Sequence, residues 1–108
     1  MSAVQVTDEH RACWALLKLA ALGTPDRIAT ALHDKGIRGD HSSRSCPIAT
    51  YLKQETGLQV AIRHQWWRVD DTPYWWSMPK PIEQFIGAFA RDAYPQLLAH
   101  LETEGEPA

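Results

Sequence analysis

The chain has 108 residues, of which 44% are hydrophobic and 22% charged, and its formal net charge at pH 7 is −2. This length and balance are typical of one globular domain with one core, and they exclude a disordered chain, which has fewer apolar residues and a larger net charge. Two cysteines, Cys13 and Cys46, are too few for a disulfide scaffold, so we expect a reducing compartment.

Charge is distributed unevenly along the chain. Residues 27–68 hold seven lysines and arginines against three acids, a balance of +4, whereas residues 69–108 hold two against seven, a balance of −5. A basic segment can bind nucleic acid or another polyanion, but ion pairs within the chain give the same pattern, and nucleic-acid footprints are usually more strongly basic. Nucleic acid is therefore an alternative partner, not the first expectation.

The beginning of the chain, MSAVQVTDEH, has no basic segment followed by an apolar one. The longest nearly apolar stretch, Trp14 to Leu22, contains Lys18 and is about half of the ~20 residues that a helix needs to cross a bilayer. We predict a cytoplasmic protein with no membrane contact.

Thr7 and the two acids behind it are typical of a helix start, so the first helix is predicted over residues 8–22, ended by Gly23. Apolar residues recur in it at three- and four-residue spacing and predict its buried stripe: Cys13, Leu16, Leu17 and Ala20.

Two further helices are predicted from their end signals. Thr24-Pro25-Asp26 begins the second, which ends at Gly36 with Ile37 folding back on Leu32. The third spans about residues 47–56, begins at Ser45 or Cys46, and ends at Gly57 with Leu58 folding back on Leu52. Residues 36–45, GIRGDHSSRS, lack an apolar period and predict an exposed loop between the two helices.

From Leu58 the apolar period changes to two, which predicts a strand; residues 70–73 predict a turn and residues 74–78 a returning strand. A symmetric turn pairs Trp67 with Trp76. The face predicted to pack on the helices then carries Trp67, Val69, Tyr74, Trp76 and Met78. The opposite face carries His64, Trp66, Arg68, Trp75 and Ser77.

Pro79 and Pro81 predict the start of a fourth helix, whose apolar stripe is the best in the chain. The stripe is Ile82, Phe85, Ile86 and Phe89. Tyr94-Pro95 interrupts the helix, and a further short helix is predicted from Leu97, Leu98 and Leu101. The predicted class is α+β in a single domain, 1–108: three N-terminal helices, a two-stranded antiparallel hairpin, then an amphipathic helix plus a short one, with residues 1–6 and 102–108 frayed.

The candidate site is the hairpin face that carries Trp66 and Trp75. Two indoles beside Arg68 and His64 form a flat surface with hydrogen-bond donors at its edge, which can stack an aromatic or planar group. With Arg38 and Arg44 from the preceding loop, these residues predict a non-enzymatic module that binds a protein partner. The competing interpretation is that the fourth helix covers this face and all four hairpin tryptophans are core.

Two alternative functions come from other patterns. The order of three helices and a hairpin is that of a winged helix, with helix 47–56 as the DNA recognition helix, although this helix carries only Lys53 as a cation. Cys46 at a helix start, near Arg44, is where a reactive thiolate is favoured, and a capping or buried cysteine is the simpler interpretation.

Other chemistry has little support in the sequence. A zinc site could be drawn from His10, Cys13, His41 and Cys46, but their spacing matches no standard finger, knuckle or ribbon. The motifs GxSxG, HExxH, GxGxxG and GxxxxGK[ST] do not occur. We therefore predict no metal, no cofactor and no catalytic residues.

Ser45-Cys46-Pro47-Ile48-Ala49, followed by Tyr51-Leu52 and later by Phe85, Phe89 and Tyr94-Pro95-Gln96-Leu97, resembles a pattern in small uncharacterised proteins of actinobacteria and their phages. The resemblance covers most of the chain and implies no activity. The two pairs of adjacent tryptophans in the hairpin depart from that pattern.

Overall fold

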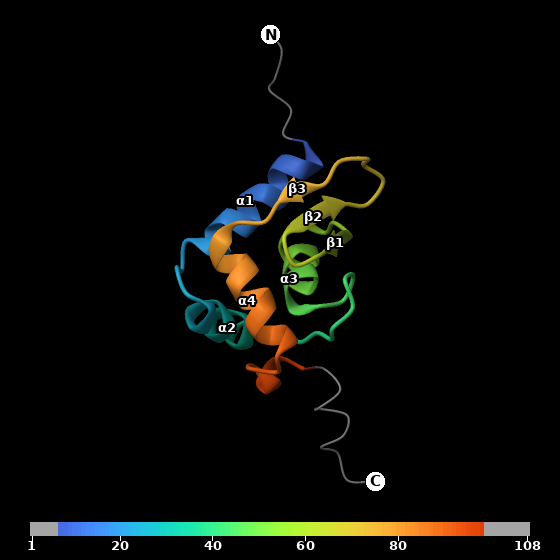
Figure 1. Ribbon diagram of the computed structural model, residues 1–108. Helices are drawn as coiled ribbons and strands as arrows, with labels where there is room; N and C mark the ends of the chain where they lie inside the picture. Colours follow the sequence, from blue (N-terminus) through green and yellow to red (C-terminus); the bar gives the residue numbers. More distant parts are fainter. Residues whose placement is uncertain (1–6, 99–108) are drawn as a thin grey trace.

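The computed structural model describes residues 7–98, which form four α-helices, a three-stranded sheet and a short 3-10 helix (Figure 1). In chain order these are α1 (Asp8–Ala20), α2 (Pro25–Asp34), α3 (Pro47–Thr56), β1 (Val60–Ile62), β2 (Trp66–Val69), β3 (Trp76–Ser77), α4 (Lys80–Ala90) and η1 (Pro95–Leu97). The α+β class is confirmed, with three strands in place of two. The expectations for residues 1–6, 102–108 and Leu101 lie outside the described residues.

Polar caps fix the start of each N-terminal helix. The hydroxyls of Thr7 and Thr24 accept hydrogen bonds from the third residues of α1 and α2, at 3.1 and 3.2 Å. At the end of α2, Gly36 adopts φ +74° and the N–H of Ile37 donates to the carbonyl of Leu32 at 3.0 Å. This is the predicted Schellman ending, and it turns Ile37 into the core.

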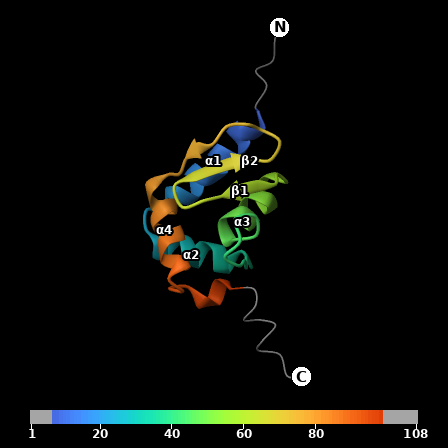
Figure 2. The ribbon, with the colours of Figure 1, turned by 45° about the vertical axis from the view of Figure 1, so that its right-hand side comes forward.

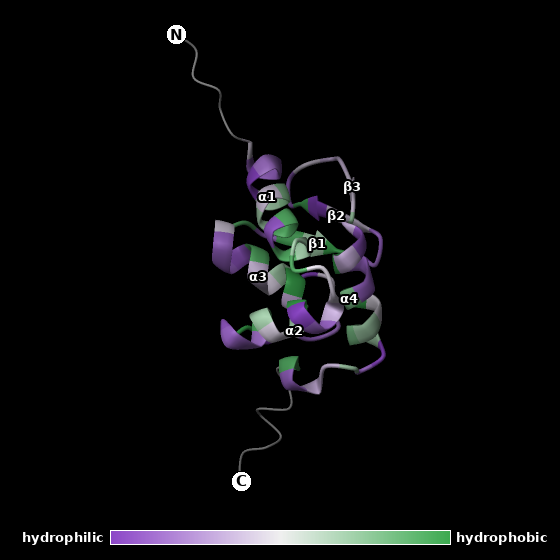
Figure 3. Cartoon of the chain, turned by 90° about the vertical axis from the view of Figure 1, so that its left-hand side faces the viewer, coloured by the Kyte–Doolittle hydropathy of each residue, from purple (hydrophilic) through white to green (hydrophobic). Residues whose placement is uncertain are grey.

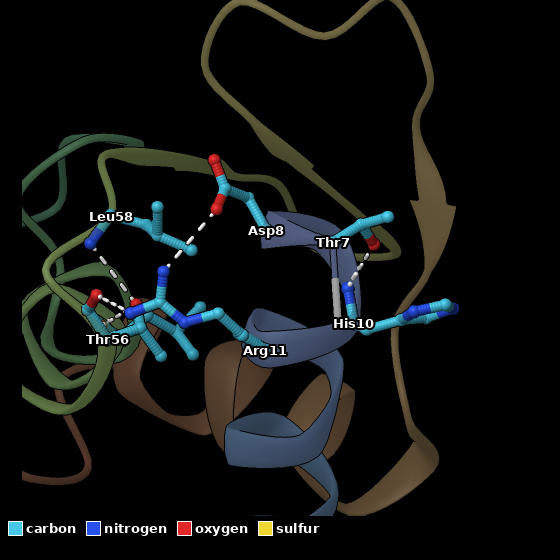
Figure 4. Close-up of polar contacts among 7 residues, drawn as sticks. Thr7, Asp8, His10, Arg11, Thr56 and Leu58 are labelled. Carbon is cyan, nitrogen blue, oxygen red and sulfur yellow. Dashed lines mark hydrogen bonds and ion pairs between the residues drawn. The ribbon is translucent and has the colours of Figure 1, made fainter. Parts of the chain in front are cut away.

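The end of α3 is joined to α1 by Arg11, as Figure 4 shows. The Arg11 guanidinium donates to the carbonyl of Thr56 at 2.6 Å and to the carboxylate of Asp8 at 3.4 Å. The Thr56 hydroxyl donates to the carbonyl of Leu52 and accepts from the N–H of Leu58 at 3.2 Å. The N–H of Leu58 thus bonds to the Thr56 side chain, whereas the N–H of Ile37 at the end of α2 bonds to a helix carbonyl, so the two helices end differently.

The sheet differs from the prediction because the chain turns at residues 63–65. β1 pairs antiparallel with β2, and β2 with β3, with Trp67 opposite Trp76 as predicted. The N–H of Arg63 donates to the carbonyl of Trp66 at 2.8 Å across this turn. One uninterrupted strand would place Val60 and Ile62 on the face opposite Trp67, whereas the turn brings all three to the buried face.

Helices cover one face of this sheet. α1 contacts β2, α3 contacts β1, and α4 packs against α1 and α2. In Figure 2 the sheet lies in front of α1, with no helix on the viewer's side of β2. Figure 3 shows the hydrophobic residues gathered between the helices and the sheet. The largest fully buried side chains are Phe85, Leu16, Ile28, Leu32, Ile37, Ile48, Leu52, Ile82, Leu97 and Val60.

The buried stripe of α1 is shifted from the predicted one. It consists of Ala12, Ala15, Leu16 and Leu19, whereas the predicted Leu17 is 52% exposed. Alanines at this face let α1 pack closely, because a small side chain allows two elements to approach. No helix in residues 7–98 is long and apolar enough to cross a lipid bilayer.

The C-terminal end of the described chain closes against the loop between α2 and α3. The N–H of Gly39 donates to the carbonyl of Leu97 at 2.8 Å, and a Cβ at Gly39 would lie 2.5 Å from the backbone nitrogen of Pro47. Only glycine fits this approach. The Tyr94 hydroxyl donates to Asp26 at 2.7 Å and so ties the start of η1 to α2, and burial raises the pKa of this phenol to about 12.

Replacing Trp66 and replacing Trp67 by alanine should have different effects on stability. Trp67→Ala should lower the free energy of unfolding by roughly 3–5 kcal/mol, because Trp67 is 2% exposed and its removal leaves a core cavity. Trp66→Ala should cost roughly 1 kcal/mol or less, because half of this side chain already faces solvent. Urea unfolding of both variants measures the difference; equal losses would contradict the register.

Candidate interaction surface

The side of the sheet that faces away from the helices carries the predicted tryptophan surface. We define the outer face as Arg63, Trp66, Arg68, Trp75 and Ser77. Trp66 lies opposite Ser77 in the ladder, and Arg68 alternates with the buried Trp67 and Val69. Trp66 is 46% exposed and Trp75 is half-buried, so α4 does not cover this face.

Two guanidiniums lie over one indole at the centre of the outer face. The Arg63 Cζ is 4.6 Å from the centroid of the Trp75 ring, and the Arg68 Cζ is 5.0 Å from it. Both distances are within the range of a cation–π interaction. Arg63, Trp66 and Trp75 together line a shallow hollow of about 290 Å³. The face therefore combines an exposed indole, a stacked indole and two cations.

Trp76 and Tyr74 are more exposed than predicted. Trp76 is 46% and Tyr74 65% exposed, although both were expected against the helices. Trp76 lies in the two-residue edge strand β3, where its ring stacks on Trp67 at 6.2 Å and its Nε1–H donates to Glu9 of α1 at 3.2 Å. Tyr74 precedes β3 and belongs to no strand. The register places Trp76 on the predicted side of the sheet with Trp67, but of the predicted face only Trp67, Val69 and Met78 are buried.

Three residues predicted to bind the partner make their contacts elsewhere in the fold: His64, Arg44 and Arg38. His64 lies at the turn, and its Nε2 is 3.2 Å from where a Cβ on Gly87 of α4 would stand, so it packs toward α4. Arg44 forms an ion pair with Asp70. Arg38 is half-buried and its guanidinium donates to the carbonyl of Ile37 at 3.3 Å. The turn at residues 63–65 is the reason for the first error, since it ends the alternation that placed His64 beside Trp66.

Sequence reasoning missed two features of the surface. An uninterrupted strand would put Arg63 on the face of Trp67, and the turn instead brings it over Trp75. Trp14, which is 70% exposed on α1, received no role. It borders a groove of about 600 Å³ between α1 and α3. The position of Trp14 in the sequence indicates its exposure. It lies outside the apolar stripe of its helix, so its indole is not part of the face that packs on the core.

Cys46 is the N-cap of α3, as predicted, but its environment opposes a reactive thiolate. Burial raises the pKa of the Cys46 thiol from 9.0 to about 11, although its Sγ accepts a hydrogen bond from the N–H of Ala49 at 3.5 Å. The thiol is therefore protonated at neutral pH. This arrangement fits a capping cysteine rather than a nucleophile.

The residues drawn into a zinc site do not meet. His41 stacks on Phe89 at 4.9 Å and lies 3.3 Å from the carboxylate of Asp92, and His10 is exposed at the start of α1. Within residues 7–98, no three His, Cys, Asp or Glu side chains gather in a way that could hold a metal ion.

The helix proposed to enter DNA has little surface for that purpose. Its buried residues are Pro47, Ile48, Ala49, Tyr51 and Leu52. The exposed residues of α3 are Lys53, Gln54 and Glu55, and Glu55 pairs with Lys35 at 4.0 Å. The DNA-binding alternative stays a prediction, with Lys53 as the exposed cation of its recognition helix.

Iodoacetamide labelling tests the state of Cys46. In a Cys13→Ala variant, the folded chain at pH 7.5 should react about a hundredfold more slowly than the same chain in denaturant, because a pKa of about 11 against 9.0 lowers the thiolate fraction by that factor. Mass spectrometry of the alkylated chain against time gives both rates. Similar rates would contradict the raised pKa, and a faster rate in the folded chain would show an activated thiol.

Comparisons of the chain with known protein families, with curated proteins and with solved structures found no match.

Proposed function

We propose that this chain is a non-enzymatic interaction module that binds a protein partner through the outer face of its sheet. The observation that carries the proposal is the half-exposed Trp66 beside Trp75, with the guanidiniums of Arg63 and Arg68 over the second indole. Tryptophan and arginine are the residue types that most often dominate the binding energy of protein interfaces.

The energy available at Trp66 is large for one side chain. A tryptophan presents roughly 150–250 Å² for burial, and 46% of Trp66 still faces solvent. At about 25 cal/mol per Å², covering that surface would contribute roughly 2–3 kcal/mol to binding. A few such contacts are enough for a specific complex, provided that polar groups at the rim are satisfied.

Binding would use the side chains of this face, because the sheet edges offer little backbone for pairing. On the β1 edge, the N–H of Ile62 donates to the carbonyl of Ser43 at 2.8 Å. On the other edge, the strand β3 is only two residues long. A strand added at β1 would have to displace the contact of Ile62, whereas the indoles and guanidiniums of the outer face need no rearrangement.

Affinity capture with a matched control tests the proposal. The tagged chain, its Trp66→Ala variant and its Trp14→Ala variant are used to capture proteins from a lysate of the native host, and the captured proteins are identified by mass spectrometry. A partner of the outer face should be retained by the wild type and by Trp14→Ala, which removes an exposed indole on another element, and lost with Trp66→Ala.

Thermal unfolding accompanies the capture. Trp66→Ala should unfold within a few degrees of the wild type, since its side chain is half exposed. If Trp66→Ala captures the same proteins in the same yield as the wild type, the outer face is not the binding surface and the proposal is wrong.

A further inference from the structure

We propose that the hollow between Arg63, Trp66 and Trp75 receives an acidic side chain, Asp or Glu, next to an apolar residue of the partner. This inference rests on the proposed function and specifies the chemistry of the partner at the same site. Three features of the outer face support it: its positive charge, the shape of the hollow, and arginine side chains that are held in place before a partner binds.

The two guanidiniums of the outer face have no acidic partner in the part of the chain that the structure describes. Neither Arg63 nor Arg68 forms an ion pair within residues 7–98. The adjoining cation of the loop, Arg44, is already matched by Asp70. A guanidinium without a carboxylate partner attracts one from outside, and arginine binds a carboxylate through two parallel hydrogen bonds.

Stacking prepares these guanidiniums for a carboxylate. A guanidinium held over an indole by a cation–π contact can still donate its remaining N–H groups to a carboxylate. The Arg68 Nε is buried without a hydrogen-bond partner in the described chain, so stacking, not hydrogen bonding at Nε, holds this side chain. Less side-chain entropy is then lost when a carboxylate binds.

Because the hollow is lined mainly by tryptophan rings, the residue of the partner next to the acid should be apolar. Trp66 and Trp75 supply two of its three lining residues, and Arg63 supplies the third. Its volume of about 290 Å³ lies at the lower limit of roughly 300–1,000 Å³ for small-molecule pockets, which suits one or two side chains of a partner. An aliphatic or aromatic residue beside the acid would cover the exposed part of Trp66.

A nucleic acid fits this surface less well than an acidic peptide. Arg63 and Arg68 converge on one ring, whereas a nucleic-acid strand needs cations spread along successive phosphates. The whole chain carries a net charge of −2, which repels a long polyanion. A single carboxylate, by contrast, needs only the local positive charge of Arg63 and Arg68.

Nuclear magnetic resonance titration with defined probes tests this inference. The first probe is a capped octapeptide, acetyl-ELEGELEG-amide; the second has glutamine at every glutamate; the third is an eight-nucleotide thymidine strand. The signals followed are the indole N–H groups of Trp66 and Trp75 and the side-chain N–H groups of Arg63 and Arg68. The glutamate peptide should shift these signals saturably, and the glutamine peptide should bind about tenfold more weakly.

A charge-matched pair of variants isolates the site. Arg63→Gln with Arg68→Gln should reduce binding of the glutamate peptide to the level of the glutamine peptide. Lys18→Gln with Arg27→Gln removes the same net charge from exposed positions of α1 and α2 and should leave binding unchanged. The backbone spectrum of each variant confirms its fold.

The contrary outcomes are distinct from failure of the proposed function. Equal binding of the two peptides, no shift with either, or tighter binding of the thymidine strand at the same signals would each overturn recognition of an acid. If a captured partner is lost with Trp66→Ala but kept by the double arginine variant, the proposed function stands and this inference is wrong. If the glutamate peptide binds as expected but capture is insensitive to Trp66→Ala, the proposed function is wrong.

Discussion

The indole of Trp67 connects the sheet to the helical layer, and the arrangement of the outer face depends on it. Its ring is buried on the side of α1, it stacks on Trp76, and its Nε1–H donates to the carbonyl of Ser77 at 3.2 Å. One side chain thus packs β2 on the core and fastens β3 to β2. Because neighbouring side chains of a strand point to opposite faces, an inward Trp67 directs Trp66 and Arg68 outward.

The turn at residues 63–65 is the second constraint on the surface. Without it, a strand that continued from Val60 to Val69 would bury one of these two residues and expose the other, since they are an odd number of positions apart. The turn lets both face the core, opposite each other in the ladder. The same reversal carries Arg63 back over Trp75. The packing of β1 and the stacked arginines therefore have a common cause.

The positive charge in the middle of the chain is partly neutralised within the fold. Arg44 pairs with Asp70 from the acidic part of the chain, and Lys35 lies 4.0 Å from Glu55. These pairs agree with the simpler explanation of the charge pattern, in which opposite charges meet inside one domain. Of the other cations, Arg63 and Arg68 lie over one tryptophan ring on the sheet, whereas Arg27 and Lys53 are exposed on α2 and α3.

Sequence by itself determined the features that depend on neighbouring residues. The caps at Thr7 and Thr24, the ending at Gly36, the span of α3 and the apolar stripe of α4 follow from local hydrogen bonding and helical periodicity, and all are observed. The pairing of Trp67 with Trp76 followed from the turn between them, because a hairpin turn fixes register over a few residues.

Only the tertiary structure decided which side chains meet across the sheet and which are free. The turn at residues 63–65 carries no glycine or proline, so its local signal is weak, and it forms because it buries Val60 and Ile62 together with Trp67. Trp76 is exposed because it lies in the two-residue edge strand β3, and the contact of Arg63 with Trp75 joins two segments twelve residues apart in sequence. Such contacts are set by the packing of whole elements, which no local pattern of residues specifies.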